Sequence, residues 1–309
     1  MTFDFKPGRR ENVNLLVALA GASGAGKTMS ALRLAKGISP SSKIFFIDTE
    51  ARRGLHYADT FQFMHADMRP PFSPDRFIEG IQAAEAADAE VVIIDSFSHE
   101  YDGEGGIMEW ADRLAESGVK SPGNWKDPKG AHKKLVGKLL QSRCHLIFCL
   151  RADEKIRIAR EGGKTVVEPL GWMPIQEKRF MYEMTASFTL IPTAPGRPFF
   201  NLPHKLQEQH RAIFPEGEPI GEDAGRKIAE WAAGDTIAPA KPKKEKSAVD
   251  LYAQKLGDVL KEAAAGDADK LSLWWAETSE TRMAINIPAD RLAKMEAAVQ
   301  KVLNPDGAT

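Results

Sequence analysis

The segment GASGAGKT, residues 21–28, carries the residue types that hold a nucleotide phosphate chain. It fits the pattern G-x-x-x-x-G-K-[ST] at every defined position and follows a short apolar run, as the motif requires. Gly24 and Gly26 let the backbone turn its N–H groups around phosphate oxygens, and the start of a following helix adds positive potential. Lys27 is expected to reach the β- and γ-phosphates, and the Thr28 hydroxyl to ligate Mg²⁺. The motif therefore predicts ATP and Mg²⁺ as cofactors, held by Gly21, Ala22, Ser23, Gly24, Ala25, Gly26, Lys27, Thr28 and Met29.

Acidic residues follow two other apolar runs. VVIIDS ends in Asp95, which we expect to hold Mg²⁺ together with Thr28, and FFIDTE brings Glu50 just past the end of another strand. Ligands of parallel sheets collect at the carboxyl ends of strands, where Glu50, Asp95 and Arg151 are expected to converge. Lys27 and Glu50 are the predicted catalytic residues, Glu50 as the general base that polarises water. Asp48 and Glu100 compete for that role, and Glu50 as an ordinary surface carboxylate is the alternative.

The apolar runs that carry these residues predict an α/β fold. Continuous β-branched runs are typical of strands covered on both faces, and the helical stretches between them favour parallel pairing. Turn residues indicate two antiparallel pairs, one around Gly162-Gly163 in residues 155–168 and one joining 185–191 to 197–202. Gly37 is expected to end the first helix in the left-handed conformation. The predicted strands are 14–20, 43–48, 90–95 and 145–150, with a short one at 61–66, and the predicted helices are 27–36, 73–87, 105–117 and 128–143.

Composition limits the class of protein. The 309 residues include 42 Lys+Arg and 43 Asp+Glu, so a uniformly basic nucleic-acid binder is excluded, although a local basic patch is not. Cys144 and Cys149 are the only cysteines and are expected on opposite faces of one strand, which disfavours a disulfide. No run of 18 apolar residues exists. We therefore expect a reduced, cytoplasmic protein that does not span a membrane.

Three regions follow from the distribution of Pro, Lys and apolar residues. Residues 1–234 are predicted to form the nucleotide-binding core. Residues 235–248, rich in Lys and Pro, are predicted to be a linker. Residues 249–309 have a helical pattern throughout, and sixty residues make a marginal fold alone. We expect this small helical domain to dock or to bind a protein partner.

The motifs resemble the core of RecA-type recombinases over residues 12 to about 200, and most closely the short RecA-like ATPases of bacteriophages associated with single-strand annealing. The resemblance maps the catalytic glutamate onto Glu50 in IDTE and the magnesium aspartate onto Asp95. It implies a RecA-like core, a mostly parallel sheet with antiparallel edge hairpins. The γ-phosphate sensor of such proteins is usually Gln, whereas Arg151 stands there. The resemblance therefore makes Arg151 a third catalytic candidate, as a sensor that contacts phosphate, and the alternative is a surface salt-bridging residue.

The resemblance also implies single-stranded DNA as a partner. Residues 120–143 carry seven Lys or Arg against the single acid Asp127, and Trp125 could stack on a base. For the lysines of the predicted helix 128–143, the alternative to DNA binding is a solvated helix surface. Residues 155–180 are a second DNA-binding candidate, and the alternative for them is a plain surface hairpin. These residues correspond to a DNA-contacting loop of this family, and cations just after that loop reach a neighbouring subunit's ATP, which makes Lys178 and Arg179 trans-acting candidates. The DNA-contact candidates are Trp125, Lys129, Lys133, Lys134, Lys138, Arg157, Arg160 and Lys164.

The expected function is therefore Mg·ATP hydrolysis coupled to single-stranded DNA binding, annealing or strand pairing in phage-type recombination within a bacterial host's cytosol. Self-association into a ring or filament would put ATP at a subunit interface. One rival is a nucleotide-gated assembly or switch ATPase that acts on a protein partner through residues 249–309 without DNA. A second rival is a helicase- or loader-type motor, because such motors share the same core motifs.

Overall fold

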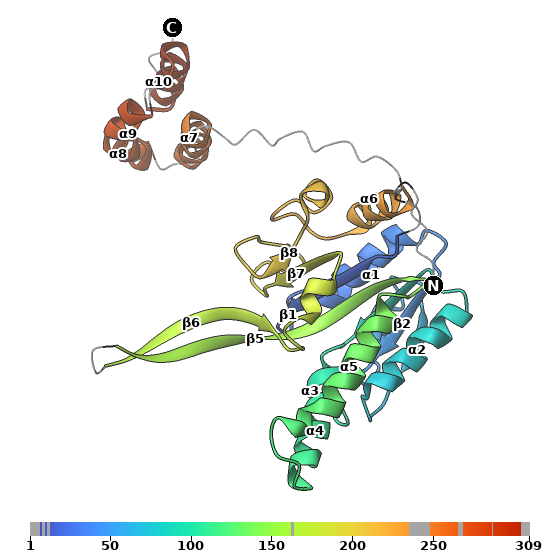
Figure 1. The fold of residues 1–309 in the computed structure, drawn as a ribbon. Coiled ribbons are helices and arrows are strands. Elements are labelled where there is room, and N and C mark those ends of the chain that lie inside the picture. Colours follow the sequence, from blue (N-terminus) through green and yellow to red (C-terminus); the bar gives the residue numbers. More distant parts are fainter. Residues whose placement is uncertain are drawn as a thin grey trace. The chain divides into compact units, whose positions relative to one another are not determined.

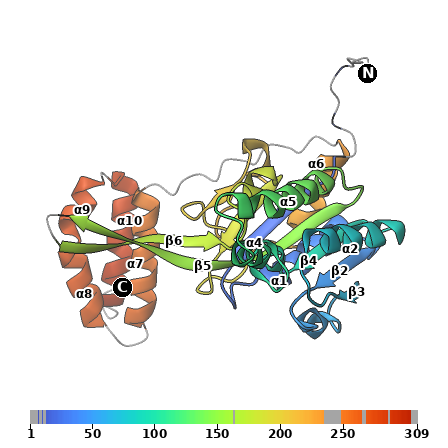
Figure 2. The same cartoon turned by 60° about the horizontal axis from the view of Figure 1, so that its bottom comes forward.

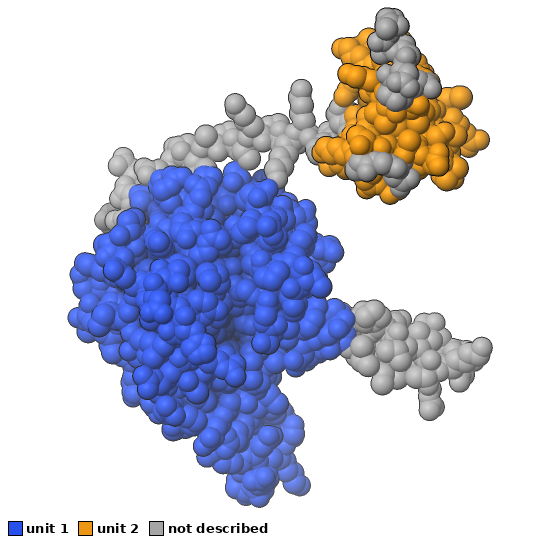
Figure 3. Space-filling model, turned by 180° about the vertical axis from the view of Figure 1, so that it is seen from behind, with its two compact units in different colours: residues 1–239 blue, residues 240–309 orange. Residues whose placement is uncertain are grey.

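The computed structural model describes residues 7, 10, 13–161, 164–234, 248–264, 268–285 and 287–303. They belong to two compact units, residues 1–239 and residues 240–309, which are coloured separately in Figure 3. Of the predicted linker, only Ala248 is described, and it is the first residue of a helix. The three-region division otherwise stays a prediction.

An eight-stranded sheet is the frame of the first unit (Figure 1). Its strands lie in the order β3-β2-β4-β5-β1-β7-β8, with β6 paired to β5 off this path. Neighbours from β3 to β7 are parallel, and both β7–β8 and β5–β6 are antiparallel. The predicted mostly parallel sheet with an antiparallel edge is confirmed. The strands are β1 (Leu16–Gly21), β2 (Ile44–Asp48), β3 (Met64–Asp67), β4 (Val91–Asp95), β5 (His145–Glu161), β6 (Lys164–Pro174), β7 (Ala186–Leu190) and β8 (His204–Lys205).

Both faces of the sheet are covered by helices. Leu15, Val17 and Leu19 of the first strand region pack in one buried cluster with helices α1 and α6, while Leu16 and Ala18 pack in another with α2 and α5. This alternation explains why the strands are apolar at every position. The helices are α1 (Lys27–Ile38), α2 (Pro74–Ala86), α3 (His99–Asp102), α4 (Ile107–Glu116), α5 (Lys126–Leu139) and α6 (Glu222–Ala233), with short 3-10 turns η1 (Arg53–Tyr57), η2 (Gly123–Trp125), η3 (Phe180–Glu183) and η4 (Glu208–His210).

The two predicted antiparallel pairs have different outcomes. The hairpin around Gly162-Gly163 is confirmed by the pairing of Glu161 with Lys164, and it extends well away from the sheet (Figures 1 and 2). The prediction that 197–202 is a strand is wrong, because β7 pairs instead with His204 and Lys205. The intervening residues form turns held by Gly217 N–H donating to Pro198 O at 2.9 Å.

Gly37 does not end helix α1 in the left-handed conformation, contrary to the prediction. The helix continues to Ile38, and Gly37 instead lies against the backbone of α6. A Cβ on Gly37 would lie 2.0 Å from Glu222 O, and a Cβ on Gly225 would lie 2.1 Å from Leu34 O. Both glycines are therefore required by backbone contact between two helices.

The second unit has a separate small core. Tyr252, Leu256, Leu271, Met295 and Val299 are among its buried residues. Within the described ranges, no helix has the length and apolarity that a membrane span needs. The helices of the second unit agree with the predicted helical character. They are α7 (Ala248–Ala264), α8 (Ala268–Glu277), α9 (Ser279–Ala284) and α10 (Ala289–Leu303).

Candidate nucleotide-binding site

The phosphate motif forms the loop between β1 and α1. Gly24 and Gly26 have φ angles of 78° and 82°, in the left-handed region that favours glycine. A Cβ on Gly26 would also lie 2.7 Å from Gly196 N. The loop thus has the backbone that the sequence motif predicts, directly ahead of a helix N-terminus.

Lys27 is turned back onto its own loop. Its Nζ donates hydrogen bonds to Gly21 O at 2.8 Å and to Ala22 O at 2.9 Å. Both acceptors are neutral carbonyl oxygens, and charged phosphate oxygens form stronger hydrogen bonds with an ammonium group. We therefore expect Lys27 Nζ to leave these carbonyl oxygens and to bind a phosphate that enters the loop.

Thr28 and Asp95 meet at the carboxyl end of β4, as expected for a magnesium site. The Thr28 hydroxyl donates to Asp95 Oδ2 at 2.6 Å, which joins the start of α1 to the end of β4. Burial raises the pKa of Asp95 to about 6, although the Thr28 hydrogen bond opposes that shift. Because burial disfavours the ionised form of Asp95, a nearby cation would stabilise that form. Hydroxyl and carboxylate oxygens are ligands that Mg²⁺ prefers. The pair therefore fits Mg²⁺.

The described residues contain no group of three or more His, Cys, Asp or Glu side chains arranged to hold a metal ion. Mg²⁺ commonly binds through one or two protein oxygens together with substrate phosphates and water. Thr28 and Asp95, beside a phosphate loop, match that mode of binding.

Asp48, the last residue of β2, and Glu50, two residues beyond it, have different surroundings. Asp48 is buried, and its carboxylate accepts hydrogen bonds from Glu50 N and Gly54 N, both at 2.8 Å, and contacts His65 Nε2 at 3.1 Å. The Glu50 side chain is only partly buried and lines the same pocket as Lys27. Asp48 is thus engaged in holding the loop, whereas Glu50 faces the space where water and phosphate would meet.

Glu100, the other competing acid, does not line this pocket. It is fully buried and lies 3.0 Å from His132 Nδ1, so it joins the α3 segment to α5. Its role in the described structure is to bridge two helices.

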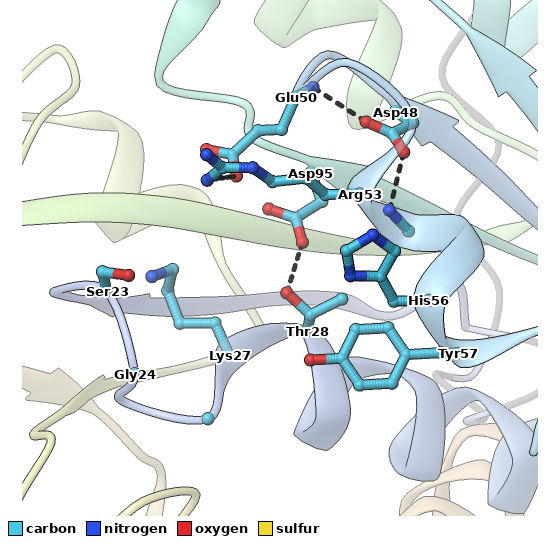
Figure 4. Close-up of a pocket in the computed structure, with 12 residues that line it drawn as sticks. Ser23, Gly24, Lys27, Thr28, Asp48, Glu50, Arg53, His56, Tyr57 and Asp95 are labelled. Atoms are coloured by element: carbon cyan, nitrogen blue, oxygen red, sulfur yellow. Dashed lines mark hydrogen bonds and ion pairs between the residues drawn. The ribbon is translucent and has the colours of Figure 1, made fainter.

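The pocket itself has a volume of about 310 Å³ (Figure 4). Sequence reasoning did not single out Arg53, His56 and Tyr57, which form its wall opposite the phosphate loop. The sequence gives little indication that these three residues line a pocket, because they follow Glu50 without matching a known motif. The lining residues are Ser23, Gly24, Gly26, Lys27, Thr28, Asp48, Glu50, Arg53, Gly54, His56, Tyr57 and Asp95.

Arg151 lies beside the phosphate loop but outside this pocket. It is paired in register with Gly21 across β5 and β1, and its Nη2 donates to both carboxylate oxygens of Asp102 at 2.8 Å. With Gly21, Ala22 and Ser23 it lines a neighbouring depression that also includes Trp172. The sensor role of Arg151 stays a prediction, and in this structure it makes the salt bridge that was its alternative.

The predicted DNA residues of α5 separate into different environments. Lys129 and Lys133 line a groove of about 360 Å³ together with Arg179, Glu177 and Glu183. Lys129 Nζ also lies 5.5 Å from the ring centroid of the half-buried Trp125. We call this the α5 groove, defined by Lys129, His132, Lys133, Val136, Glu177, Arg179, Phe180 and Glu183.

The other predicted DNA and trans-acting residues lie elsewhere. Lys134 Nζ is 2.8 Å from Asp75 Oδ1, and Lys138 borders a separate depression between α2 and α5. Lys178 is exposed beside Arg179. Arg157, Arg160 and Lys164 belong to the β5–β6 hairpin, but their side chains lie outside what the structure describes.

Residues 14–195 match the protein family described as AAA domain. No curated protein matches the sequence. Among solved structures, the chain is similar to a KaiC-like protein from the hyperthermophilic archaeon Pyrococcus horikoshii, with 18% identity, a TM-score of 0.34, and coverage of 60% of this chain and 82% of that one.

Proposed function

We propose that this chain, which belongs to the AAA domain family, binds and hydrolyses Mg·ATP. We further propose that it couples hydrolysis to single-stranded DNA in annealing or strand pairing. The observation that carries the ATPase part is the 2.6 Å contact between Thr28 and Asp95. It joins the phosphate loop to the magnesium aspartate in a pocket that also contains Glu50. The RecA-like P-loop fold supplies the frame.

Hydrolysis then uses the pocket's own side chains. The oxygen of water forms a bond to the γ-phosphorus while the bond to the β–γ bridging oxygen breaks, and Glu50 accepts the proton that water loses. Lys27 and the loop N–H groups stabilise the negative charge on the phosphate oxygens. Thr28 and Asp95 would hold Mg²⁺, which would supply further neutralisation of phosphate charge. The products are ADP and inorganic phosphate.

The α5 groove supports the DNA part of the proposal. Lys129, Lys133 and Arg179 bring positive charge from two elements, and Trp125 presents an aromatic surface beside them. Cationic grooves with aromatic neighbours are typical of proteins that bind single strands. Glu177 and Glu183 lower the net charge of the groove, so phosphate contacts there should be few.

A protein-directed switch is the second candidate, favoured by exposed apolar side chains of the helical unit. Leu273 and Met283 are 62% and 79% exposed in a unit of only about fifty described residues. Exposed large apolar residues on a small domain can mark a partner surface. Under this alternative, nucleotide state would control a protein contact and DNA would have no effect.

Steady-state hydrolysis with and without single-stranded DNA tests the proposal. Lys27→Ala is the blank, because it removes the phosphate contact. We expect DNA-stimulated hydrolysis in the wild type and loss of both activities in the blank. Hydrolysis that ignores DNA, with no DNA binding at low salt in the presence of ATP, would remove the DNA part and favour the switch.

The α5 groove is tested separately by binding of labelled single strands at several salt concentrations. The double variant Lys129→Gln/Lys133→Gln should bind more weakly, and its log–log salt slope should fall by roughly 0.7 per lost phosphate contact. Lys134→Gln is the matched comparison, because Lys134 is on the same helix but pairs with Asp75. Equal losses in the two variants would indicate a diffuse charge effect rather than a groove.

A further inference from the structure

Arg53 lies on the wall of the phosphate pocket, and no sequence motif gives it a role. Its Nη1 is 3.7 Å from Glu50 Oε2, and its side chain is 74% exposed. Among the described residues that line the pocket, Lys27 and Arg53 are the two with a permanent positive charge. Figure 4 shows the Arg53 guanidinium beside the Glu50 carboxylate, over the space that Asp95 and Lys27 also face.

The backbone around Arg53 is fixed by the loop that carries Glu50. Asp48 accepts hydrogen bonds from Glu50 N and from Gly54 N, and Arg53 N donates to Glu50 O at 3.3 Å. Between these points Ala51 and Arg52 have φ angles of 55° and 68°, which non-glycine residues adopt only where the surroundings fix them. The Arg53 side chain can therefore change partner while its backbone and that of Glu50 stay in place.

The two partners available to Arg53 differ in strength. Its contact with Glu50 is long and exposed to solvent, and such ion pairs are weak and screened by salt. A phosphate group offers several charged oxygens to the planar guanidinium, which binds phosphate in two parallel hydrogen bonds. A γ-phosphate in this pocket would therefore compete well against Glu50.

We infer that Arg53 is a phosphate-binding residue that acts in cis and exchanges partners: it holds Glu50 when no γ-phosphate is present and turns onto the γ-phosphate of its own chain's ATP. This inference rests on the proposed ATPase function and adds a residue to it. Once Arg53 has moved, the Glu50 carboxylate is released to accept the proton of the attacking water. ADP lacks the γ-phosphate, so Arg53 returns to Glu50 after hydrolysis.

The partner exchange predicts an effect specific to the γ-phosphate. Nucleotide binding is measured by displacement of a fluorescent nucleotide, using Mg²⁺ with ADP or with the non-hydrolysable β,γ-imido analogue of ATP. Arg53→Gln should raise the Kd of the ATP analogue about 10-fold or more and change the Kd of ADP less than about 2-fold. Its kcat should fall about 100-fold or more, as expected when a cation on the transferred phosphate is lost.

Two matched variants separate position from charge. Arg52→Gln removes the same charge one residue away, outside the pocket lining, and should leave both Kd values and kcat unchanged. Arg53→Lys keeps the charge without the guanidinium fork and should recover part of the lost affinity. Because Arg53 is exposed, the variants should share the wild-type thermal unfolding curve, which serves as a folding check.

The outcomes separate this inference from the proposed function. Wild-type protein that binds no nucleotide would overturn both. Wild-type binding with Arg53→Gln indistinguishable from Arg52→Gln, or with ADP and ATP analogue weakened equally, would overturn the Arg53 inference alone.

A mixing experiment distinguishes cis from trans action. Lys27→Ala protein keeps Arg53 but cannot use its own ATP site, and Arg53→Gln protein keeps the site but lacks the cation. If Arg53 acts in cis, an equal mixture hydrolyses no more ATP than the average of its two components. Activity restored by mixing would overturn the cis assignment.

Discussion

The Asp48 side chain holds the loop that follows β2 and carries Glu50. It is 1% exposed and accepts the N–H groups of Glu50 and Gly54. In Asp48→Asn one acceptor oxygen is replaced by an NH₂ group that faces a backbone donor. We expect the free energy of unfolding to fall by about 1–3 kcal/mol and kcat to fall about 10-fold or more, since Glu50 loses its fixed position. Urea unfolding and steady-state hydrolysis measure the two effects.

Asp67→Asn is the control for that change, because Asp67 ends the neighbouring strand β3 and is paired with Arg69 at the surface. It should change both quantities little. Wild-type kcat in Asp48→Asn would show that Glu50 is positioned by other contacts.

At the residue scale, the sequence predicted those site residues that belong to short contiguous motifs. The phosphate loop, Thr28 and Asp95 follow from short patterns at strand ends, and the structure brings them together. Arg53 and Asp48 act through a loop whose left-handed residues and buried hydrogen bonds depend on tertiary contacts. No local pattern indicates such a loop, so Arg53 was missed and Asp48 was interpreted as a rival catalytic acid.

Two helix glycines make a matched test at the scale of elements. A Cβ on Gly225 of α6 would lie 2.1 Å from Leu34 O, whereas a Cβ on Gly130 of α5 would have nothing within 4 Å. Gly225→Ala should lower the free energy of unfolding by about 1–3 kcal/mol, because α1 and α6 must separate. Gly130→Ala should raise it by about 0.5–1 kcal/mol through helix propensity. Equal effects in urea unfolding would contradict the close packing of α1 against α6.

The start of β5 makes the stability of the first unit dependent on pH. Burial lowers the pKa of His145, whose Nδ1 accepts the N–H of Leu15 at 3.1 Å and so must be unprotonated. Burial also lowers the pKa of His99 and His210. Below the ordinary histidine pKa of 6.5 the unfolded chain binds protons that the folded chain resists, so these histidines lower the free energy of unfolding as pH drops from about 6.5 to 5. Asp95, whose pKa is raised in the folded state, opposes this loss in the same pH range.

His145→Asn tests this pH dependence, since the amide oxygen can still accept the Leu15 N–H without titrating. Urea unfolding at pH 7.5, 6.5 and 5 should show a smaller acid loss in the variant than in the wild type, with little change for either protein between about pH 7 and 8. The same acid loss in both proteins would exclude His145 as a contributor.

The elements predicted best are those buried on both sides. The runs that became β2, β4 and the first part of β5 are apolar at nearly every position, because helices cover both faces of the sheet. The run 197–202 carries Pro and two Phe and has a similar composition, but turn contacts such as Gly217 N–H to Pro198 O determine its conformation. The prediction that Gly37 ends α1 was wrong because a tertiary contact, not the helix end, requires this glycine: Gly37 lies against the backbone of α6.

At the scale of the whole molecule, the two units are expected to work separately for nucleotide binding. Every described residue that lines the phosphate pocket lies within 1–239, and the described residues of the second unit's buried cluster all lie from Val249 onward. A protease site inserted at residues 240–247 allows the same protein to be compared before and after cutting. ATP affinity and unstimulated hydrolysis of the purified core should be unchanged.

The cut also separates the two candidate functions. If DNA is the effector through the α5 groove, stimulation by single strands survives in the core. If a protein partner is the effector through residues 249–309, the core keeps hydrolysis but loses the response to that partner. Loss of ATP binding on cutting would contradict the independence of the two units.

Lys178 and Arg179 carry the prediction that ATP is shared between subunits. Neither lines the phosphate pocket of its own chain, and both are exposed after β6. Lys178→Ala/Arg179→Ala protein should lose most hydrolysis alone, yet regain part of it when mixed with Lys27→Ala protein. In an equal random mixture about a quarter of the interfaces would join an intact ATP site to intact cations.

The Arg53→Gln mixture is the internal control for this experiment, because a residue that acts on its own chain's ATP cannot be supplied by a neighbour. Size-exclusion chromatography of the mixture must show assemblies larger than one chain. Such assemblies without any recovery would contradict trans action by Lys178 and Arg179. If the double variant instead keeps unstimulated hydrolysis and loses only DNA binding, Arg179 acts within the α5 groove, where it lies beside Lys129 and Lys133.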